Sequence, residues 1–149
     1  MARTMLPADV VSSSSSTSPI RILDADDDEA MRSLLGASLR REGFEVQECV
    51  DGGELLAELE AARNGDPAPD LVVSDLRMPG VNGLDVLHWL RQWLPEVPVI
   101  LITAFGDRQV HKRAEALGAV MVIDKPFDLG EFLEHVRETS KRYPVGVHD

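Results

Sequence analysis

Five short apolar segments, separated by stretches with helical periodicity, constrain the fold of this chain more than any other feature. The segments begin near Ile20, Phe44, Leu71, Val99 and Ala119. Strands that alternate with helices are joined by right-handed crossovers, which make the strands parallel and put helices on both faces of the sheet. The pattern therefore predicts an α/β fold with five strands in a mostly parallel sheet and five helices around it.

The first helical stretch shows the periodicity on which this prediction depends. It begins near Asp28 and carries four apolar residues at helical spacing, Met31, Leu34, Leu35 and Leu39. Spacings of three and four residues place side chains on the same side of a helix. The sequence therefore predicts one apolar face that includes all four residues.

The two ends of the chain are predicted to lie outside the folded unit. Residues 1–19 contain a serine-rich run that cannot bury enough apolar surface to offset its ordering entropy, which predicts a disordered tail. Pro144 is expected to end the last helix. Residues 20–142 are therefore predicted to form one domain, and residues 143–149 a short tail.

Composition limits the environments in which this chain works. The formal net charge is −11, which disfavours direct binding to nucleic-acid phosphates. No apolar run approaches the roughly 20 residues of a membrane span, so no membrane insertion is expected. The single cysteine, Cys49, permits no internal disulfide, and the N-terminus lacks the apolar core of a secretory signal. We expect a soluble, cytoplasmic protein.

Polar residues stand where four of the five predicted strands end. Asp26 and Asp27 follow the first strand, Asp75 the third, Thr103 the fourth and Lys125 the fifth. In open parallel sheets the ligand site lies outside the carboxyl ends of the strands, at the point where the strand order reverses. The sequence therefore predicts that these side chains share one site.

The residue types at these strand ends suit phosphoryl chemistry. Neighbouring carboxylates repel one another unless a proton or a cation compensates, and Mg²⁺ prefers oxygen ligands of this kind. A carboxylate nucleophile, Mg²⁺, the ammonium of Lys125 and the hydroxyl of Thr103 are the parts needed to place a phosphoryl group on an aspartate. Each residue also has an ordinary explanation: Asp28 could cap a helix, Asp75 could stabilise a turn, and Lys125 could be a solvated loop residue.

The ordered set of motifs resembles the receiver domain of two-component response regulators, of the stand-alone, chemotaxis-regulator-like type. The resemblance covers about residues 20–142 and rests on Asp26-Asp27, Asp75 with Met78-Pro79-Gly80 and Gly83, Thr103-Ala104 and Lys125-Pro126-Phe127. Each motif alone is weak, whereas the ordered set is specific. The resemblance implies a flavodoxin-like (βα)5 three-layer sandwich whose parallel strands lie in the order 2-1-3-4-5.

The resemblance also implies a role for the acidic residues. Asp75 would be the phosphoacceptor. Asp27 would bind Mg²⁺ directly, Asp26 would bind it through water, and the backbone carbonyl of Arg77 would be the remaining protein ligand beside Asp75. Mg²⁺ is accordingly the expected cofactor.

Further roles implied by the resemblance concern the phosphoryl oxygens and the switch. Thr103 and Lys125 would contact the phosphoryl oxygens, and the Lys125–Pro126 peptide would be cis. In this family the threonine moves inward on phosphorylation and reshapes the surface of the fourth helix, fifth strand and fifth helix. Many receivers carry Tyr or Phe where this chain has Val122, so switching is expected to be muted or to use another side chain. The alternative is that Val122 simply fills the core.

Three other positions concern the lifetime of the phosphoaspartate or a departure from the family pattern. Arg77 and Phe105 flank the phosphorylation pocket at positions where the family sets the lifetime of the phosphoaspartate, and ordinary surface variation is the alternative. Asp24 stands inside the first strand, where family members usually have an apolar residue. A carboxylate there must be partnered, protonated or close to the surface, because an unpaired buried charge is very costly.

The implied function is that of a stand-alone receiver, which is primarily a signalling module although it catalyses its own phosphorylation and dephosphorylation. It would take a phosphoryl group from a sensor histidine kinase and signal to a downstream protein or through a phosphorylation-dependent dimer. Because five residues follow Pro144, no DNA-binding or ATPase output domain is expected in this chain. The alternatives are a relay intermediate that passes the phosphoryl group to a histidine phosphotransfer protein, a fragment of a longer regulator, a scaffold that turns over no phosphate, and a flavodoxin-like cofactor binder.

Overall fold

Strands and helices alternate along the part of the chain that the computed structural model describes, residues 19–104 and 108–142. The elements are β1 (Arg21–Ala25), α1 (Glu29–Arg41), β2 (Glu45–Cys49), α2 (Gly52–Arg63), β3 (Leu71–Asp75), α3 (Gly83–Trp93), β4 (Val99–Thr103), α4 (Arg108–Ala116), β5 (Met121–Asp124) and α5 (Leu129–Arg142). Apart from Pro19, the two predicted tails lie outside the described residues, as does Phe105.

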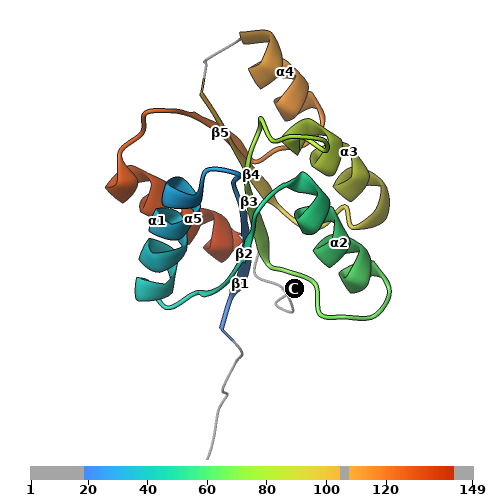
Figure 1. Cartoon of the computed structure of the whole chain (residues 1–149), viewed down its shortest axis with the longest axis horizontal. Helices are drawn as coiled ribbons and strands as arrows, with labels where there is room; N and C mark the ends of the chain where they lie inside the picture. The colour runs from blue at the N-terminus through green and yellow to red at the C-terminus, as the bar shows by residue number, and fades with distance from the viewer. Residues whose placement is uncertain (1–18, 105–107, 143–149) are drawn as a thin grey trace, which may run out of the picture.

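The five strands form one parallel sheet in the order β2-β1-β3-β4-β5. Helices α1 and α5 cover one face of the sheet, and α2, α3 and α4 lie on the other (Figure 1). This arrangement confirms the predicted three-layer fold and its strand order. The order reverses at β1, which lies between β2 and β3, so the crevice at the carboxyl ends of β1 and β3 is the expected ligand position.

Two apolar cores lie on opposite faces of the sheet because side chains alternate along each strand. Leu23 of β1 packs in the core under α2 and α3, whereas its neighbour Ile22 packs in the core under α1 and α5. Every residue of β3 and β4 is buried, as expected for the centre of a sheet covered on both faces. No helix within residues 19–104 and 108–142 is long and apolar enough to cross a membrane.

Helix α1 departs from the predicted apolar face at one position. Leu35 and Leu39 are fully buried and Met31 is half-buried, whereas Leu34 leaves 49% of its surface exposed. Residues 31, 35 and 39 are four apart and follow one line along the helix, while residue 34 lies about 100° from residue 35. The prediction that Leu34 shares the buried face was therefore wrong.

Polar side chains end the loops that lead into α1 and α3. Asp28 is the N-cap of α1 and its side chain accepts a hydrogen bond from the backbone N–H of Ala30. Asn82 and Asp85 form a reciprocal capping box at the start of α3, with distances of 2.9 and 3.1 Å. Caps of this type satisfy N–H groups that have no partner inside the helix. These caps fix the positions of the loops after β1 and β3, on which the site depends.

Candidate functional site

Three carboxylates meet at the carboxyl ends of β1 and β3. Asp26 and Asp27 follow β1, and Asp75 is the last residue of β3. One carboxylate oxygen from each of the three residues lies within 4.8 Å of the others. Asp26 and Asp75 are buried and Asp27 is exposed, so the cluster opens to solvent on the Asp27 side.

Asp26 is held in place by contacts on both its side chain and its backbone. Its Oδ1 accepts a hydrogen bond of 2.9 Å from the backbone N–H of Asp28, and its backbone oxygen accepts one of 2.7 Å from Arg32 Nη1. Its Oδ2 is buried and accepts no hydrogen bond from any described residue. Burial raises the pKa of Asp26, while the Asp28 N–H and Lys125 oppose that rise. The Asp26 Oδ2 atom thus faces the cluster without a hydrogen-bond donor.

Lys125 brings a positive charge to the acidic cluster from the end of β5. Its Nζ lies 3.6 Å from Asp75 Oδ1 and 3.9 Å from Asp26 Oδ2. The backbone N–H of Lys125 donates a hydrogen bond of 2.7 Å to the backbone oxygen of Thr103, and the Lys125–Pro126 peptide is cis. Thr103 is buried at the end of β4. Five of the predicted site residues therefore gather at one edge of the sheet.

The environment of Asp75 sets its protonation state. Burial, together with the charges of Asp26 and Asp27, raises the pKa of Asp75 to about 6, and Lys125 opposes this rise. The carboxylate is therefore mostly ionised at neutral pH. An ionised carboxylate is the nucleophilic form that a covalent reaction at this position requires.

The donor set fits a small, hard divalent cation. Three carboxylates supply oxygen ligands, and the buried Asp26 Oδ2 is a polar atom without a hydrogen-bond donor among the described residues. Mg²⁺ is bound by one or two carboxylates and keeps several waters, for which the open side at Asp27 leaves access. The residues present therefore fit Mg²⁺.

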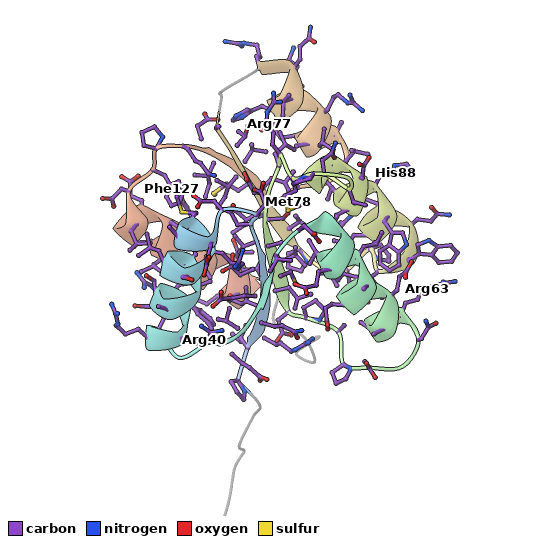
Figure 2. The ribbon with its side chains drawn as sticks, in the orientation of Figure 1. Arg40, Arg63, Arg77, Met78, His88 and Phe127 are labelled. Carbon is purple, nitrogen blue, oxygen red and sulfur yellow. The ribbon has the colours of Figure 1, made fainter. Side chains whose placement is uncertain are left out.

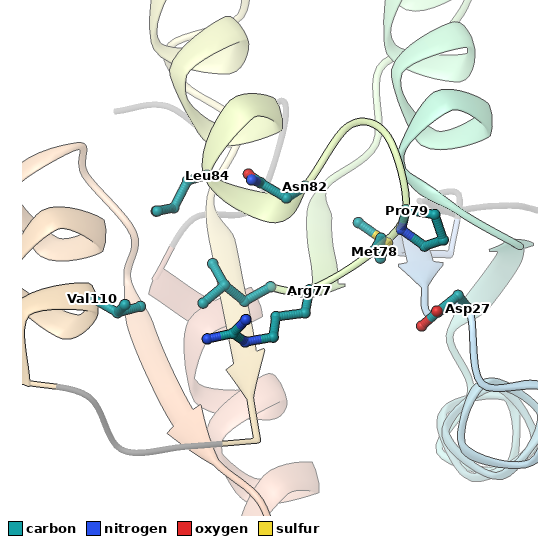
Figure 3. Close-up of a pocket in the computed structure, with 8 residues that line it drawn as sticks. Asp27, Arg77, Met78, Pro79, Asn82, Leu84 and Val110 are labelled. Carbon is teal, nitrogen blue, oxygen red and sulfur yellow. The ribbon is translucent and has the colours of Figure 1, made fainter.

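A cavity of about 510 Å³ opens beside the acidic cluster and is bounded by the loop after β3 and by α4. Arg77 extends across this cavity towards Val110 of α4, while Asp27 and Pro79 lie on the opposite side (Figure 3). Arg77 is exposed and projects at the end of the molecule where the strands finish (Figure 2). The cavity leaves room for a reactant beside Asp27, and the side chain of Arg77 extends across it (Figure 3).

A second cavity, of about 340 Å³, lies on the other side of Lys125 and is almost entirely apolar. Its lining comes from α1, from the segment between β5 and α5 and from the first residue of α5, and consists of Met31, Leu34, Lys125, Pro126, Phe127 and Leu129. This cavity, an apolar groove beside Lys125, was not predicted from the sequence, because the periodicity of α1 placed Leu34 in the core. The spacing in α1 could have revealed it, because Leu34 lies about 100° around the helix from Leu35, away from the line of residues 31, 35 and 39.

The environment of Asp24 decides between the alternatives left open for it. Both carboxylate oxygens are buried and accept no hydrogen bond from the described residues. Asp24 lies beside Glu48 of β2. The Glu48 carboxylate forms ion pairs with Arg40 Nη1 at 2.9 Å and with Arg32 Nε at 3.5 Å. Burial, and then the charges of Glu48 and Asp26, raise the pKa of Asp24 to about 8. Asp24 is therefore predominantly protonated at neutral pH.

Val122 packs into the core in place of an aromatic side chain. It is half-buried, lies beside Leu101 in the sheet and contacts the core under α2 and α3. On the same strand, Asp124 Oδ1 is hydrogen-bonded to Nε2 of His111 of α4 at 2.8 Å. The expectation of a muted or rerouted switch stays a prediction.

Comparison with known proteins gives a consistent result. A family model described as the response regulator receiver domain matches residues 22–137. Sporulation initiation phosphotransferase F of Bacillus subtilis is 30% identical over 123 residues, which are 83% of this chain and 92% of that protein. The crystal structure of a CheY-like receiver domain protein from Methanospirillum hungatei JF-1 superposes with a TM-score of 0.75 at 26% identity, covering 85% of this chain and 97% of that one.

Other relatives are longer than this chain. The DNA-binding transcriptional regulator NtrC of Salmonella typhimurium is 35% identical over 118 residues, which are 79% of this chain but 24% of that protein. The chain likewise spans 54% and 49% of two further curated regulators, TcrX of Mycobacterium tuberculosis and RpaA of Synechocystis. The match to these proteins is therefore a match to one part of each.

Proposed function

The chain belongs to the response regulator receiver domain family of two-component systems, and on this premise we propose that it accepts a phosphoryl group from a phosphohistidine onto the carboxylate of Asp75. The observation that carries the proposal is the position of Asp75, with Lys125 Nζ at 3.6 Å and the carboxylates of Asp26 and Asp27 within 4.8 Å. The ionised Asp75 is the nucleophile. Its attack forms a phosphorus–oxygen bond as the phosphorus–nitrogen bond of the donor breaks, and the departing imidazole nitrogen keeps the electron pair and takes up a proton.

The remaining site residues hold charge and position the reactants. Asp26, Asp27, Asp75 and the backbone carbonyl of Arg77 are the proposed ligands of Mg²⁺. Mg²⁺, when bound, offsets the negative charge of the carboxylates and of the phosphoryl oxygens. Lys125 attracts one phosphoryl oxygen, and the hydroxyl of Thr103 donates a hydrogen bond to another. Such catalysis consists of positioning and charge neutralisation.

Asp27→Asn is expected to weaken Mg²⁺ binding by at least about tenfold, because it removes one carboxylate charge from the exposed side of the cluster. The measurement is isothermal titration of the metal-free protein with Mg²⁺, followed by mass spectrometry after incubation with acetyl phosphate. The parent should gain one phosphoryl group only when Mg²⁺ is present.

Glu29→Gln is the matched control for Asp27→Asn. Glu29 is an exposed acid in the first turn of α1, two residues from Asp27, and carries no proposed ligand role. It should keep the parental affinity for Mg²⁺. Equal losses in the two variants would show that the site responds to general charge and has no specific ligand at Asp27.

The apolar groove beside Lys125 is the proposed docking position for the phosphodonor protein. Lys125 lines the groove and also contacts Asp75, so a helix seated against Leu34 and Phe127 would present its phosphohistidine to the cluster. Amphipathic helices bind grooves of this kind through their apolar faces. A sensor histidine kinase or a histidine phosphotransfer protein is the proposed donor.

Leu34→Ser is expected to lower the rate of phosphotransfer from the cognate kinase by about tenfold, because an exposed apolar anchor is lost from the interface. Phosphorylation by acetyl phosphate should not change, since that small donor needs no docking surface. The control is Trp93→Ser, which alters another exposed apolar side chain at the far end of α3. Unchanged kinase transfer in Leu34→Ser would exclude the groove as the docking site.

The output of the chain is proposed to be protein-mediated. Signalling through a downstream protein or a phosphorylation-dependent dimer is the leading form, and the net charge of −11 disfavours direct contact of this chain with nucleic acid. A relay role is the second candidate, favoured by the match to a sporulation phosphotransferase along 92% of that protein's length. Transfer of the phosphoryl group from phosphorylated protein to a histidine phosphotransfer protein would distinguish the relay role.

A further inference from the structure

A close contact between α2 and the loop after β3 gives Gly52 a role that its position in the sequence does not suggest. Gly52 is the first residue of α2 and is buried. A Cβ atom built on Gly52 would lie 1.8 Å from the backbone oxygen of Val81 and 2.7 Å from its carbonyl carbon. Because Cβ atoms essentially never come within 3.0 Å of another heavy atom, any other residue would force the backbone apart by about 1 Å.

Gly52 is needed for space and not for its backbone angles. Among the glycines that the structure describes, Gly43, Gly65, Gly80 and Gly118 have positive φ, and Gly52 does not. Any residue could therefore adopt the backbone conformation of Gly52. The constraint arises from the approach of Val81, whose carbonyl oxygen is the nearest atom and whose Cβ would lie 3.0 Å from a Cβ on Gly52.

A second glycine, Gly83, closes the loop between β3 and α3 that contains Val81. The backbone N–H of Gly83 donates a hydrogen bond of 2.8 Å to the backbone oxygen of Leu76. A Cβ atom on Gly83 would lie 2.9 Å from the backbone oxygen of Asp75 and 3.0 Å from the Cα of Leu76. The loop that contains Arg77 is thus confined between the end of β3 and the start of α2.

The start of α2 is fixed in its own right. The side chain of Asp51 accepts a hydrogen bond of 2.8 Å from the backbone N–H of Glu54, and Glu54 Oε1 accepts one of 2.7 Å from the backbone N–H of Val50. These two hydrogen bonds secure the first turn of the helix. The start of α2 is therefore held in position, and the Val81 carbonyl packs against it.

We infer that Gly52 is a positioning residue for the acceptor site. By letting α2 approach Val81, it holds the loop that carries the Arg77 carbonyl beside Asp75. The inference rests on the proposed function, since it is that function which gives the Arg77 carbonyl its role as a ligand. Supporting groups around a metal site affect metal affinity although they do not touch the ion.

Gly52→Ala tests the inference, with Gly53→Ala as the matched control. A Cβ on Gly53 would meet only Asp51 Oδ1, at an ordinary contact distance of 3.5 Å. Both substitutions replace glycine by the better helix former at consecutive positions of α2. Mg²⁺ binding, measured by isothermal titration, is expected to weaken about tenfold in Gly52→Ala and to stay at the parental value in Gly53→Ala.

A second measurement needs no metal. Hydrogen exchange of the Gly83 amide in the metal-free protein reports the bond to Leu76 that closes the loop. The amide should lose protection in Gly52→Ala and keep it in Gly53→Ala. A folded Gly52→Ala variant with parental Mg²⁺ affinity and parental Gly83 protection would overturn the inference.

Asp51→Ala covers the case in which Gly52→Ala does not fold. It removes the side-chain acceptor that fixes the first turn of α2 and inserts no atom near Val81, so Gly83 protection should fall and Mg²⁺ binding should weaken by a few fold. Parental values for both quantities would again overturn the inference. If the parent chain binds no Mg²⁺, the proposed function fails, whereas the Gly83 exchange data still decide whether Gly52 holds the loop.

Discussion

Asp75→Asn is expected to abolish phosphorylation by acetyl phosphate and by a histidine kinase. An amide is nearly the same size as the carboxylate but cannot form the acyl phosphate, so the variant keeps the shape of the site and loses its nucleophile. Intact-mass spectrometry after incubation with acetyl phosphate and Mg²⁺ should show one phosphoryl adduct on the parent and none on the variant. Loss of one of three clustered carboxylates also relieves repulsion, so the variant should be at least as stable as the parent.

Asp28→Asn provides the control for this loss. Asp28 lies next to the cluster but serves as the N-cap of α1, and asparagine caps a helix as well as aspartate does. The variant should therefore keep both its stability and its phosphorylation. If Asp75→Asn still gained a phosphoryl group, peptide mapping would identify another acceptor and the assignment of Asp75 would be rejected.

Asp24→Val is expected to stabilise the protein, and increasingly so as the pH rises. In the folded protein burial raises the pKa of Asp24 from 3.8 to about 8, so the folded state keeps a proton that the unfolded state has lost. A folded state that binds more protons loses stability with rising pH, and this loss runs from about pH 4 to about pH 8. The cost of Asp24 is about 1–2 kcal/mol at pH 5 and on the order of 5 kcal/mol at pH 8.

Urea unfolding of the metal-free protein at pH 5 and pH 8 measures this difference. Valine suits a buried strand position and removes the ionisable group, so the variant should show a flatter pH dependence than the parent. Asp66→Asn, an exposed residue in the loop before β3, should follow the parent at both pH values. A stabilisation that is equal at pH 5 and pH 8 would show that packing, and not ionisation, accounts for the effect of Asp24.

The fold could be predicted from the sequence because its signals are local. The alternation of apolar segments and helical periodicity, with polar residues at the strand ends, indicated a parallel sheet with Asp75 and Lys125 at one edge. The strand order came from the resemblance to a family. Leu34 was wrongly assigned to the buried face because the apolar spacings in α1 fit two adjacent faces of the helix. Which of the two faces is buried depends on the elements that pack against α1.

Features that depend on distances between elements could not be predicted. The approach of α2 to the Val81 carbonyl involves residues 29 positions apart, and nothing in the local pattern at Gly52 distinguishes it from Gly53. The state of Asp24 likewise depends on Arg32 and Arg40, which pair with Glu48 and leave Asp24 without a donor among the described residues. The sequence therefore predicted that Asp24 is partnered, protonated or close to the surface, but only the structure shows that it is protonated.

Helix α4 is attached to the rest of the molecule by less buried surface than the other helices on its face of the sheet. Among residues 108–116 only Ala114 is fully buried, whereas α2 and α3 each bury several residues. Local opening costs least where few apolar contacts are lost, so we expect α4 to detach more readily than α2 or α3. A ligand or modification would shift α4 between attached and detached forms only by the difference in its affinity for the two.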